Sequence, residues 1–188
     1  MRLFFAVELI ESIKHAMGEA MARVAIRDLP WRWVAPANVH LRLKFLGEIA
    51  EDDIEELSAC AVDACRDLPP FEIRFGQLGG FPSLSRPRVL FFRVEEGVRP
   101  LGLMAERLDE LLAQRLEIPR ETRPFQAHAT IARVKTAISP HIAEVLHTVP
   151  PLGGATQAVQ TLSLMCSQLH PHGAKYHRLK EFALTKTR

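Results

Sequence analysis

The sequence predicts an α+β fold with mainly antiparallel strands arranged in two similar lobes. Three observations lead to this prediction. Segments with the alternation of strands are mixed with amphipathic helical segments, without the regular strand–helix repeat of parallel α/β proteins. The same order of elements runs through both halves of the chain. One strand in each half carries a histidine, within residues 38–48 and 127–134.

The composition limits the class of protein. The chain has 188 residues, enough for one domain built from two lobes that share a core. Hydrophobic residues make up 47% and charged residues 24%, as in soluble globular proteins. A formal net charge of +2 argues against a strongly basic coat for nucleic acids. A local basic surface remains open, because net charge does not report where the charges lie.

The first half of the chain alternates between strands and helices. Its first helix has Ile10, Ile13, Met17 and Met21 at helical spacing. Its second helix begins with acidic residues, which the helix dipole favours at that end, and Pro69 ends it. We expect strands at residues 2–8, 38–48, 71–78 and 88–94, and helices at residues 10–26 and 51–68.

The second half follows a similar order. Leu101, Met104 and Leu108 form one stripe of a helix over residues 100–116. The breaker sequence VPPLGG ends a short helix that follows a histidine-bearing strand. We expect strands at residues 127–134, 155–166 and 175–184, and the short helix at residues 139–148.

The amino terminus shows no targeting pattern. The stretch MRLFFAVELIESIK begins apolar, but Glu8 and Glu11 interrupt it too early for a signal peptide or a membrane span. Cys60, Cys65 and Cys166 are an odd number with no paired spacing, which argues against a disulfide framework or a thiolate zinc site. We therefore expect a cytoplasmic protein with reduced thiols and no membrane association.

The strand NVHLRLKFLGE raises a question about its polar face. Alternation places Leu41, Leu43 and Phe45 on one face, and this parity favours a core position for Phe45. His40, Arg42 and Lys44 share the other face. This second face is either an ordinary solvent face or the wall of a site for an anion.

A second histidine-bearing strand favours an anion site over an ordinary solvent face. In HATIAR, His128 and Thr130 share one face, just as His40 and Arg42 do in HLRLKF. Two imidazoles beside one phosphorus suit the hydrolysis of a phosphodiester, because one accepts a proton from water and the other donates a proton to the leaving oxygen. A hydroxyl beside the imidazole can donate to a phosphate oxygen. No metal or other cofactor is needed for this chemistry.

Several segments together resemble a known family. They are the opening strand MRLFFAVEL, the first motif region RWVAPANVHLRLKFLGE, the central strands PPFEIRFGQLGGFPSLSRPRVLFF, the second motif RPFQAHATIARVK and the terminal hairpin SQLHPHGAKYHRLKEFAL. Over nearly its whole length the chain is similar to the 2H phosphoesterase superfamily. Within it, the chain resembles the RNA 2′,3′-cyclic phosphodiesterase family, also called 2′-5′ RNA ligases.

The resemblance implies a fold and an activity. The expected fold is one domain over residues 1–188, with two intertwined lobes, pseudo-twofold symmetry and outer helices. Two antiparallel sheets would form its central cleft. The implied activity is hydrolysis of 2′,3′-cyclic phosphate ends to 2′-phosphomonoesters, with reversible 2′-5′ RNA joining as an added activity. The implied partners are such RNA ends or small cyclic nucleotides, and we expect a monomer.

The resemblance also implies residue roles. His40 matches the catalytic histidine expected to donate a proton, and His128 matches the one expected to accept it, although near symmetry leaves the order open. Thr130 matches a phosphate-contacting hydroxyl, and Arg133 matches the arginine that follows it. Regular parity puts Arg133 on the face opposite His128, so it needs a twist, a bulge or its long side chain to reach the site. Tyr176 matches a segment near the site, as a contact to ribose or phosphate or as a packed hairpin residue.

Two positions depart from the family pattern. Ala127 stands where the family often has proline, a change that concerns backbone conformation only. Arg42 stands where the first motif usually has threonine or serine. A guanidinium can grip two phosphate oxygens, but it is large enough to obstruct the site or to hold the product too well.

Alternatives to this enzyme remain. The first is a non-catalytic protein that binds RNA ends or nucleotides, in which Arg42 increases affinity for the ligand at the expense of turnover. The second is a metal-dependent hydrolase that uses His170, His172 and His177. We discount it, because Pro171 and Gly173 indicate a turn with exposed histidines. Trp33, in a loop, is a further candidate for stacking against a base.

Overall fold

The computed structural model describes residues 1–22, 29, 31–170 and 173–186. Its helices are α1 (Glu11–Ala22), α2 (Ile54–Cys65), α3 (Val98–Leu116) and α4 (Pro140–His147), with short 3-10 turns η2 (Pro36–Asn38) and η3 (Glu51–Asp53). Its strands are β1 (Arg2–Glu8), β2 (Arg32–Trp33), β3 (His40–Glu48), β4 (Phe71–Phe81), β5 (Val89–Glu96), β6 (His128–Arg133), β7 (Thr156–Val159), β8 (Thr161–His170) and β9 (Gly173–Ala183). The α+β class is therefore confirmed. The helix predicted over residues 10–26 is described from Glu11 to Ala22. Residues 23–28, which include its predicted end, lie outside the described ranges.

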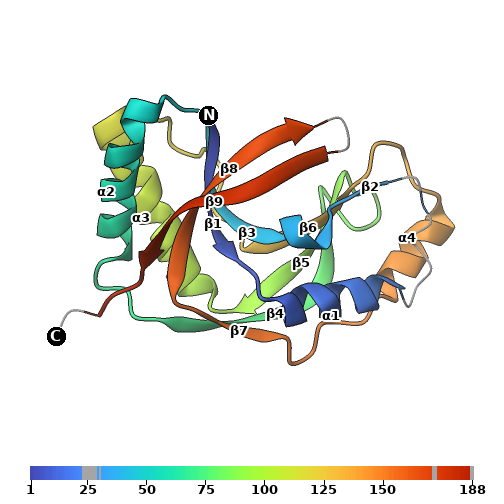
Figure 1. Ribbon diagram of the computed structural model, residues 1–188. Coiled ribbons are helices and arrows are strands. Elements are labelled where there is room, and N and C mark those ends of the chain that lie inside the picture. Colours follow the sequence, from blue (N-terminus) through green and yellow to red (C-terminus); the bar gives the residue numbers. More distant parts are fainter. Residues whose placement is uncertain (23–28, 30, 171–172, 187–188) are drawn as a thin grey trace.

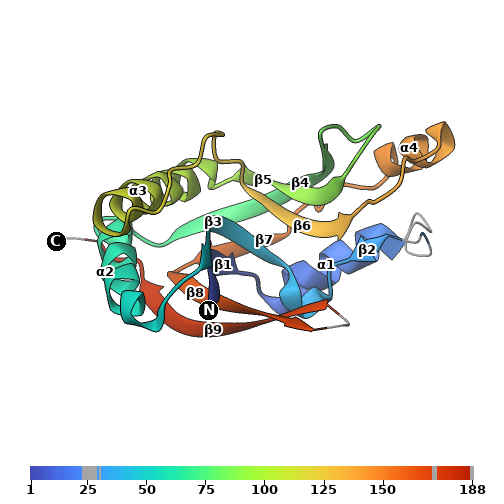
Figure 2. The ribbon, with the colours of Figure 1, turned by 90° about the horizontal axis from the view of Figure 1, so that it is seen from above.

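The strands form one antiparallel sheet, which curls strongly (Figures 1 and 2). Its order is β7-β4-β5-β6-β3-β1-β8-β9, and the short β2 pairs with β6. The prediction of two separate sheets was wrong on this point, because β3 and β6 pair directly at Leu41 and Ala129. Each predicted sheet is one half of the continuous sheet, and the two histidine strands are the inner strands of the halves.

The chain crosses from one half of the sheet to the other near its end. The sequence predicted one strand over residues 155–166, but two strands form there. β7 pairs with β4, and β8 pairs with β1 at the far side of the sheet. Gln160 separates the two strands. Alternating burial does not reveal which neighbour a strand has, so the sequence pattern could not show this crossing.

The helices cover one face of the sheet. α2 and α3 lie together at one end of the molecule, and α1 and α4 lie at the other end (Figures 1 and 2). Their apolar residues, such as Ile13, Leu57 and Leu108, belong to one buried cluster with Phe5 and Leu41 of the sheet. The polar residues that alternate with the sheet residues of this cluster therefore face away from the helices. No helix within the described ranges is long and apolar enough to cross a membrane.

A bulge in β3 reverses the predicted faces of Lys44 and Phe45. β1 pairs Ala6 with Arg42 and then Phe5 with Lys44, so Leu43 is an extra residue in β3. An extra residue shifts the alternation of every side chain that follows it. Lys44 is consequently buried, at 3% exposure, whereas Phe45 is 38% exposed. The prediction that Phe45 has a core position was wrong for this reason.

Lys44 ties β3 to α3 through a buried ion pair. Its ammonium donates to Asp109 Oδ1 at 2.6 Å and to the Pro119 carbonyl at 2.7 Å. Asp109 also accepts from the backbone N–H of Glu121 and from Arg120. Although burial alone raises the pKa of Asp109, these hydrogen bonds and the Lys44 charge hold that pKa below its usual range. The pair therefore fixes the loop after α3 against the underside of β3.

We predict that Asp109→Ala lowers the free energy of unfolding by about 3 kcal/mol, because it leaves the Lys44 ammonium buried without its main partner. Chemical denaturation followed by circular dichroism measures this change. The double variant Lys44→Met/Asp109→Leu should recover most of the lost stability, because it removes both charges together. A single variant as stable as the unchanged protein would contradict the prediction. Asp63→Ala, which removes one carboxylate partner of Arg115 and Arg66 nearer the surface, is the matched control with a smaller effect.

Candidate active site

The pairing of β3 with β6 brings the two histidine motifs together. Leu41 and Ala129 are opposite each other and buried beneath the sheet. Continuing the antiparallel register by one residue pairs His40 with Thr130 and Arg42 with His128, on the other face. The two histidines are then diagonal neighbours, for which the spacing is about 7–8 Å. The register agrees with the predicted grouping of these four residues around one site.

A second bulge brings Arg133 to the same face. β5 pairs Phe91 with Thr130 and then Leu90 with Ala132, so Ile131 is an extra residue in β6. Ile131 and Ala132 are both buried, and Arg133 is exposed on the face of Thr130. In a regular strand Arg133 would lie on the opposite face from His128, and the bulge moves it to the face of the site. It also makes Arg133 in β6 the counterpart of Phe45 in β3, because each follows a bulge at the same distance from its histidine.

His40 sits in an aromatic setting that fixes its orientation. Its ring centroid lies 4.8 Å from that of Phe4 on β1 and 5.3 Å from that of Tyr176 on β9. Its Nδ1 lies 2.7 Å from the carbonyl oxygen of Asn38. The Asn38 side chain donates to the Ala174 carbonyl at 2.7 Å, which ties β9 and thus Tyr176 to the start of β3. Tyr176 therefore contacts the histidine, as well as Phe4 of a small second apolar cluster.

His128 has a closely similar setting in the other half. Its ring centroid lies 4.9 Å from that of Phe91 on β5 and 5.2 Å from that of Phe81 on β4. Its Nδ1 lies 2.6 Å from the carbonyl oxygen of Gln126. In both motifs, Nδ1 of the histidine is thus hydrogen-bonded to the carbonyl two residues before it, and the ring packs against two aromatic rings.

These hydrogen bonds select the nitrogen that exchanges protons. A carbonyl oxygen only accepts, so Nδ1 of each neutral ring carries the hydrogen and donates it. Nε2 is then the basic nitrogen of His40 and of His128. Two imidazoles that each present Nε2 suit proton transfer at opposite sides of one substrate atom.

Burial and positive charge keep both rings neutral in the free protein. The pKa of His40 is lowered from 6.5 to about 4, chiefly by desolvation and also by the Arg42 charge. Desolvation also lowers the pKa of His128, with further lowering by Arg42 and Arg93. The hydrogen bond from each Nδ1 acts in the opposite direction but does not outweigh burial. Neither ring is protonated at neutral pH before an anion binds.

Arg42 is the charge at the centre of the group. It acts on the pKa of both histidines, and its own guanidinium pKa is lowered, first by desolvation and then by the Arg133 charge. Part of Arg42 nevertheless remains exposed to solvent. Two guanidinium groups that repel each other beside two neutral imidazoles make a site that favours an anion.

The nearest cross-strand neighbours differ in charge between the two histidines. Glu8 of β1 pairs with His40, and its charge raises the pKa of that ring. Arg93 of β5 pairs with His128, and its charge lowers the pKa of that ring. The Glu8 carboxylate accepts from Ser163 at 2.7 Å and lies 3.2 Å from Arg178, so it is held in place. The cross-strand partners of the two histidines therefore differ in the sign of their charge, although Lys14 opposes Glu8 by lowering the pKa of His40.

The sequence predictions missed the aromatic rings that pack on the histidines. Phe4, Phe81 and Phe91 come from strands far apart in the sequence, so no local pattern connects them with the motifs. Glu8 and Arg93 were missed for the same reason. Trp33 packs against Trp31, with ring centroids 5.7 Å apart, and its chain segment pairs with the end of β6, so base stacking on Trp33 stays a prediction.

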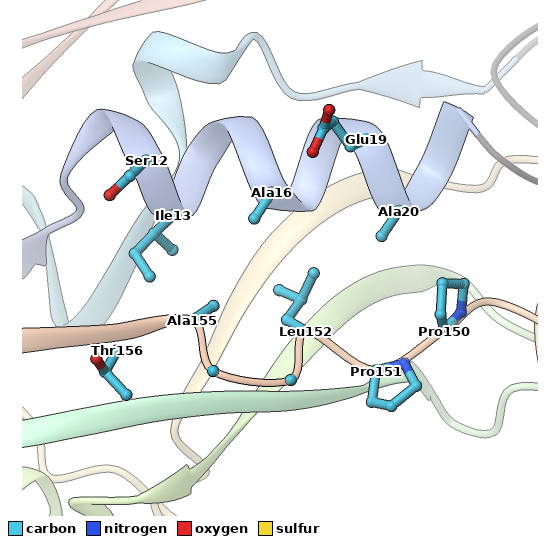
Figure 3. Close-up of a pocket in the computed structure, with 12 residues that line it drawn as sticks. Ser12, Ile13, Ala16, Glu19, Ala20, Pro150, Pro151, Leu152, Ala155 and Thr156 are labelled. Atoms are coloured by element: carbon cyan, nitrogen blue, oxygen red, sulfur yellow. The ribbon is translucent and has the colours of Figure 1, made fainter.

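Two surface pockets are lined by neither of the two histidines nor by Arg42. One, of about 410 Å³, lies between α1 and the loop before β7, where Ala16, Ala20 and Leu152 border the space (Figure 3). Its lining contains one carboxylate, Glu19, and no basic residue, so it does not suit a phosphate. The other, of about 310 Å³, is lined in part by Arg178 and by Glu8, the cross-strand neighbour of His40.

The structure describes only part of His170, His172 and His177, the histidines of the terminal hairpin considered above as metal ligands. His172 lies outside the described residues, and His177 is exposed on β9. His170 ends β8, and its side chain is likewise not described. Among the residues that are described, no three histidine, cysteine or acidic side chains gather as a metal site would require.

We predict that Arg42→Thr raises the pKa of both His40 and His128, because it removes a positive charge that disfavours each imidazolium. Proton NMR titration of the two rings measures the shift. Arg99→Gln, which removes an exposed arginine on α3, should leave both values unchanged. A rise in the pKa of only one ring, or of neither ring, would show that the Arg42 charge does not act on both histidines.

Comparison with known proteins identifies the family. A family model described as LigT like Phosphoesterase matches residues 7–91. The RNA 2′,3′-cyclic phosphodiesterase of Thermus thermophilus is 37% identical over 189 residues, which cover 98% of this chain and 90% of that protein. The enzyme of the same name from Aquifex aeolicus is 33% identical over 153 residues, or 81% of each chain.

Solved structures agree with this relationship. The crystal structure of a Thermus thermophilus protein aligns with a TM-score of 0.81 at 33% identity, covering 98% of both chains. E. coli LigT in complex with 3′-AMP aligns with a TM-score of 0.77 at 28% identity, again covering 98% of both chains. The resemblance seen in the sequence motifs is thus confirmed over almost the entire chain. The chain belongs to the RNA 2′,3′-cyclic phosphodiesterase family of LigT-like phosphoesterases.

Proposed function

We propose that this protein hydrolyses 2′,3′-cyclic phosphate ends of RNA to 2′-phosphomonoesters, with His40 and His128 as its acid and base and without a metal. One observation carries the proposal. Two imidazoles, each oriented by a backbone carbonyl, stand at diagonal positions of paired strands with Arg42 beside both. A phosphodiester that occupies the space between them has one Nε2 on each side.

The residues between the histidines suit the phosphate oxygens. Thr130 is opposite His40, and its hydroxyl can donate to one non-bridging oxygen. Arg42 is opposite His128, and its guanidinium can donate to one or both. These donors stabilise the negative charge that grows on the oxygens in the transition state. Arg133 adds positive charge beside Arg42, and Tyr176 lines the His40 side of the site.

The reaction balances as an in-line displacement. His128 accepts a proton from water, and the water oxygen forms a bond to phosphorus. The bond from phosphorus to the 3′ oxygen breaks, and His40 gives that oxygen a proton. The product carries a 2′-phosphate and a free 3′ hydroxyl. RNA joining would open the same cyclic phosphate, with a 5′ hydroxyl of a second RNA as the nucleophile in place of water and a 2′-5′ phosphodiester as its product, and would need the same acid and base.

The charges beside the histidines support this order of roles. Glu8 stabilises a protonated His40, as a proton donor requires. Arg93 favours a neutral His128, as a proton acceptor requires. Because burial holds the pKa of His40 near 4 in the free protein, Glu8 alone does not protonate it at neutral pH. The bound phosphodiester supplies the additional negative charge, so substrate binding and protonation of His40 occur together.

We predict that His40→Ala and His128→Ala each reduce hydrolysis of a 2′,3′-cyclic phosphate RNA end by about 10²- to 10⁴-fold, the usual contribution of one general acid or base. Release of the 2′-phosphate product in excess chelator measures the loss, with circular dichroism to show that each variant folds. Near-normal turnover in either variant would reject that histidine, and loss of wild-type activity in chelator would reject the metal-free reaction.

A sulfur leaving group separates the acid from the base. A substrate with sulfur in place of the 3′ oxygen needs no proton donor, because a thiolate leaves readily. This substrate should restore much of the activity of His40→Ala and little of that of His128→Ala. Rescue of His128→Ala instead would reverse the two roles.

A binding protein without turnover is the second candidate, and Arg42 is the observation that favours it. A large cation occupies the position that corresponds to Thr130 in the other motif. We predict that Arg42→Thr raises KM for the cyclic phosphate about tenfold or more with a smaller change in kcat, because a charged contact to the phosphate is lost. Steady-state kinetics measure the two constants separately. A large rise in kcat would instead show that Arg42 obstructs turnover, which would support the binding protein.

A further inference from the structure

One end of the histidine-bearing face carries basic side chains beyond those assigned to the reaction. Arg32 of β2 pairs with Arg133 of β6, so the two side chains lie on one face of the sheet. The ladder continues past β6, because the Val134 N–H donates to the Arg88 carbonyl at 3.0 Å. Alternation through this extended segment puts Lys135 on the face of Arg133. Arg32, Arg133 and Lys135 are all exposed, and we call them the basic track.

The basic track has no carboxylate to neutralise it among the residues that the structure describes. Arginines elsewhere in the molecule form ion pairs with carboxylates, namely Arg66, Arg74, Arg115, Arg120 and Arg178. Aspartate and glutamate are absent from residues 29–47, 73–94 and 122–143, which contain β2, β6 and most of β3, β4 and β5. A net charge of +2 for the whole chain thus coexists with a local surface of uncompensated positive charge.

The basic track begins at the proposed phosphate position. Arg133 follows Thr130 by three residues, one of which is the extra residue of the bulge, so it lies at most about 10 Å farther along β6. The Arg133 charge also lowers the guanidinium pKa of Arg42, as expected if the two groups are near each other. Arg32 lies beside Arg133, and Lys135 lies beyond it. The track therefore leads from the site toward the end of β6.

The proposed reaction determines which part of the substrate meets this track. Water enters beside His128, and the 3′ oxygen leaves on the opposite side of phosphorus, beside His40. The ribose that carries this oxygen, and the RNA chain attached to that ribose, then lie on the side away from His128. Because β6 begins at His128 and ends at Arg133, the basic track is at the end of β6 on that side. Arginine and lysine are common partners of backbone phosphates.

We propose that Arg32, Arg133 and Lys135 bind the backbone phosphates of the RNA strand that precedes the cyclic phosphate. The inference rests on the proposed function and deepens it, because it makes RNA chains, rather than mononucleotides, the preferred substrates. Contacts to phosphates carry no information about base sequence, and they weaken as the salt concentration rises.

Two substrates that differ only in backbone charge test the proposal. Both are tetra-adenylates that end in a 2′,3′-cyclic phosphate and carry 2′-O-methyl groups upstream, and one has neutral methylphosphonate links in place of the upstream phosphodiesters. The measured quantity is the kcat/KM of the charged substrate divided by that of the neutral one. We expect a wild-type ratio well above one. Arg32→Gln/Lys135→Gln should lower the ratio about 10- to 100-fold, because two charged contacts to phosphate are lost, and should leave kcat/KM of the neutral substrate unchanged.

The matched control is Arg99→Gln/Lys186→Gln, which also removes one arginine and one lysine from exposed positions. Arg99 is in α3 and Lys186 follows β9. α3 and the carboxyl end of the chain lie at the opposite end of the molecule from β2 (Figures 1 and 2). This control should keep the wild-type ratio. In the track variant, log kcat/KM of the charged substrate should also fall less steeply with log salt, by about 0.7 for each lost contact.

The outcomes separate this inference from the proposed function. A wild-type ratio near one, or a ratio that Arg32→Gln/Lys135→Gln leaves unchanged, overturns the basic track while hydrolysis itself stands. An equal loss on both substrates, or an equal fall of the ratio in the control, also overturns it. If the wild type hydrolyses neither substrate, the proposed function fails, and calorimetric binding of the two tetra-adenylates with 2′-phosphate ends then decides. Weaker binding of only the charged one by the track variant supports the basic track, and unchanged binding overturns it.

Discussion

The pairing of Leu41 with Ala129 is the contact on which the site depends. Both side chains are buried beneath the sheet, so a slip of one residue would send apolar groups into solvent and the histidines into the core. Hydrophobic burial thus fixes the register of the two inner strands, and the register fixes the distance between His40 and His128. The geometry of the proposed catalytic pair therefore follows from packing on the opposite face of the sheet.

The two bulges add a second layer of constraint. Without them, Phe45 and Arg133 would lie on the helix-covered face, where a guanidinium has no aqueous surroundings. The bulge in β3 also sends Lys44 beneath the sheet, where Asp109, at 2.6 Å, and the Pro119 carbonyl accept from its ammonium. The ion pair under the sheet and the aromatic ring above it are therefore two results of one extra residue, Leu43.

The sequence alone predicts much of this arrangement, and the limits have physical causes. Alternation in residues 40–43 and 128–130 is regular, so the shared faces of His40 with Arg42 and of His128 with Thr130 followed directly. The inversion at Lys44 could not be predicted, because the extra residue appears only in the register with β1. The rings of Phe81 and Phe91 and the charges of Glu8 and Arg93 reach the histidines through strand neighbours that alternation does not specify. The alternation of residues within a strand determines which face a side chain lies on, whereas the pairing of strands determines which residues it contacts.

The same surroundings that suppress protonation in the free protein make the site responsive to its ligand. Aromatic rings remove water from both imidazoles, and Arg42 adds a repulsive charge, so each proton is held weakly while the site is empty. A phosphodiester brings a negative charge into a region with little water, where its effect on nearby groups is strong. In the proposed reaction, the phosphodiester neutralises Arg42 and favours protonation of the ring beside Glu8 more than that of the ring beside Arg93. In the proposed mechanism, the two similar histidines take opposite roles only after the substrate has bound, and the charges on the neighbouring strands decide which of them is the acid.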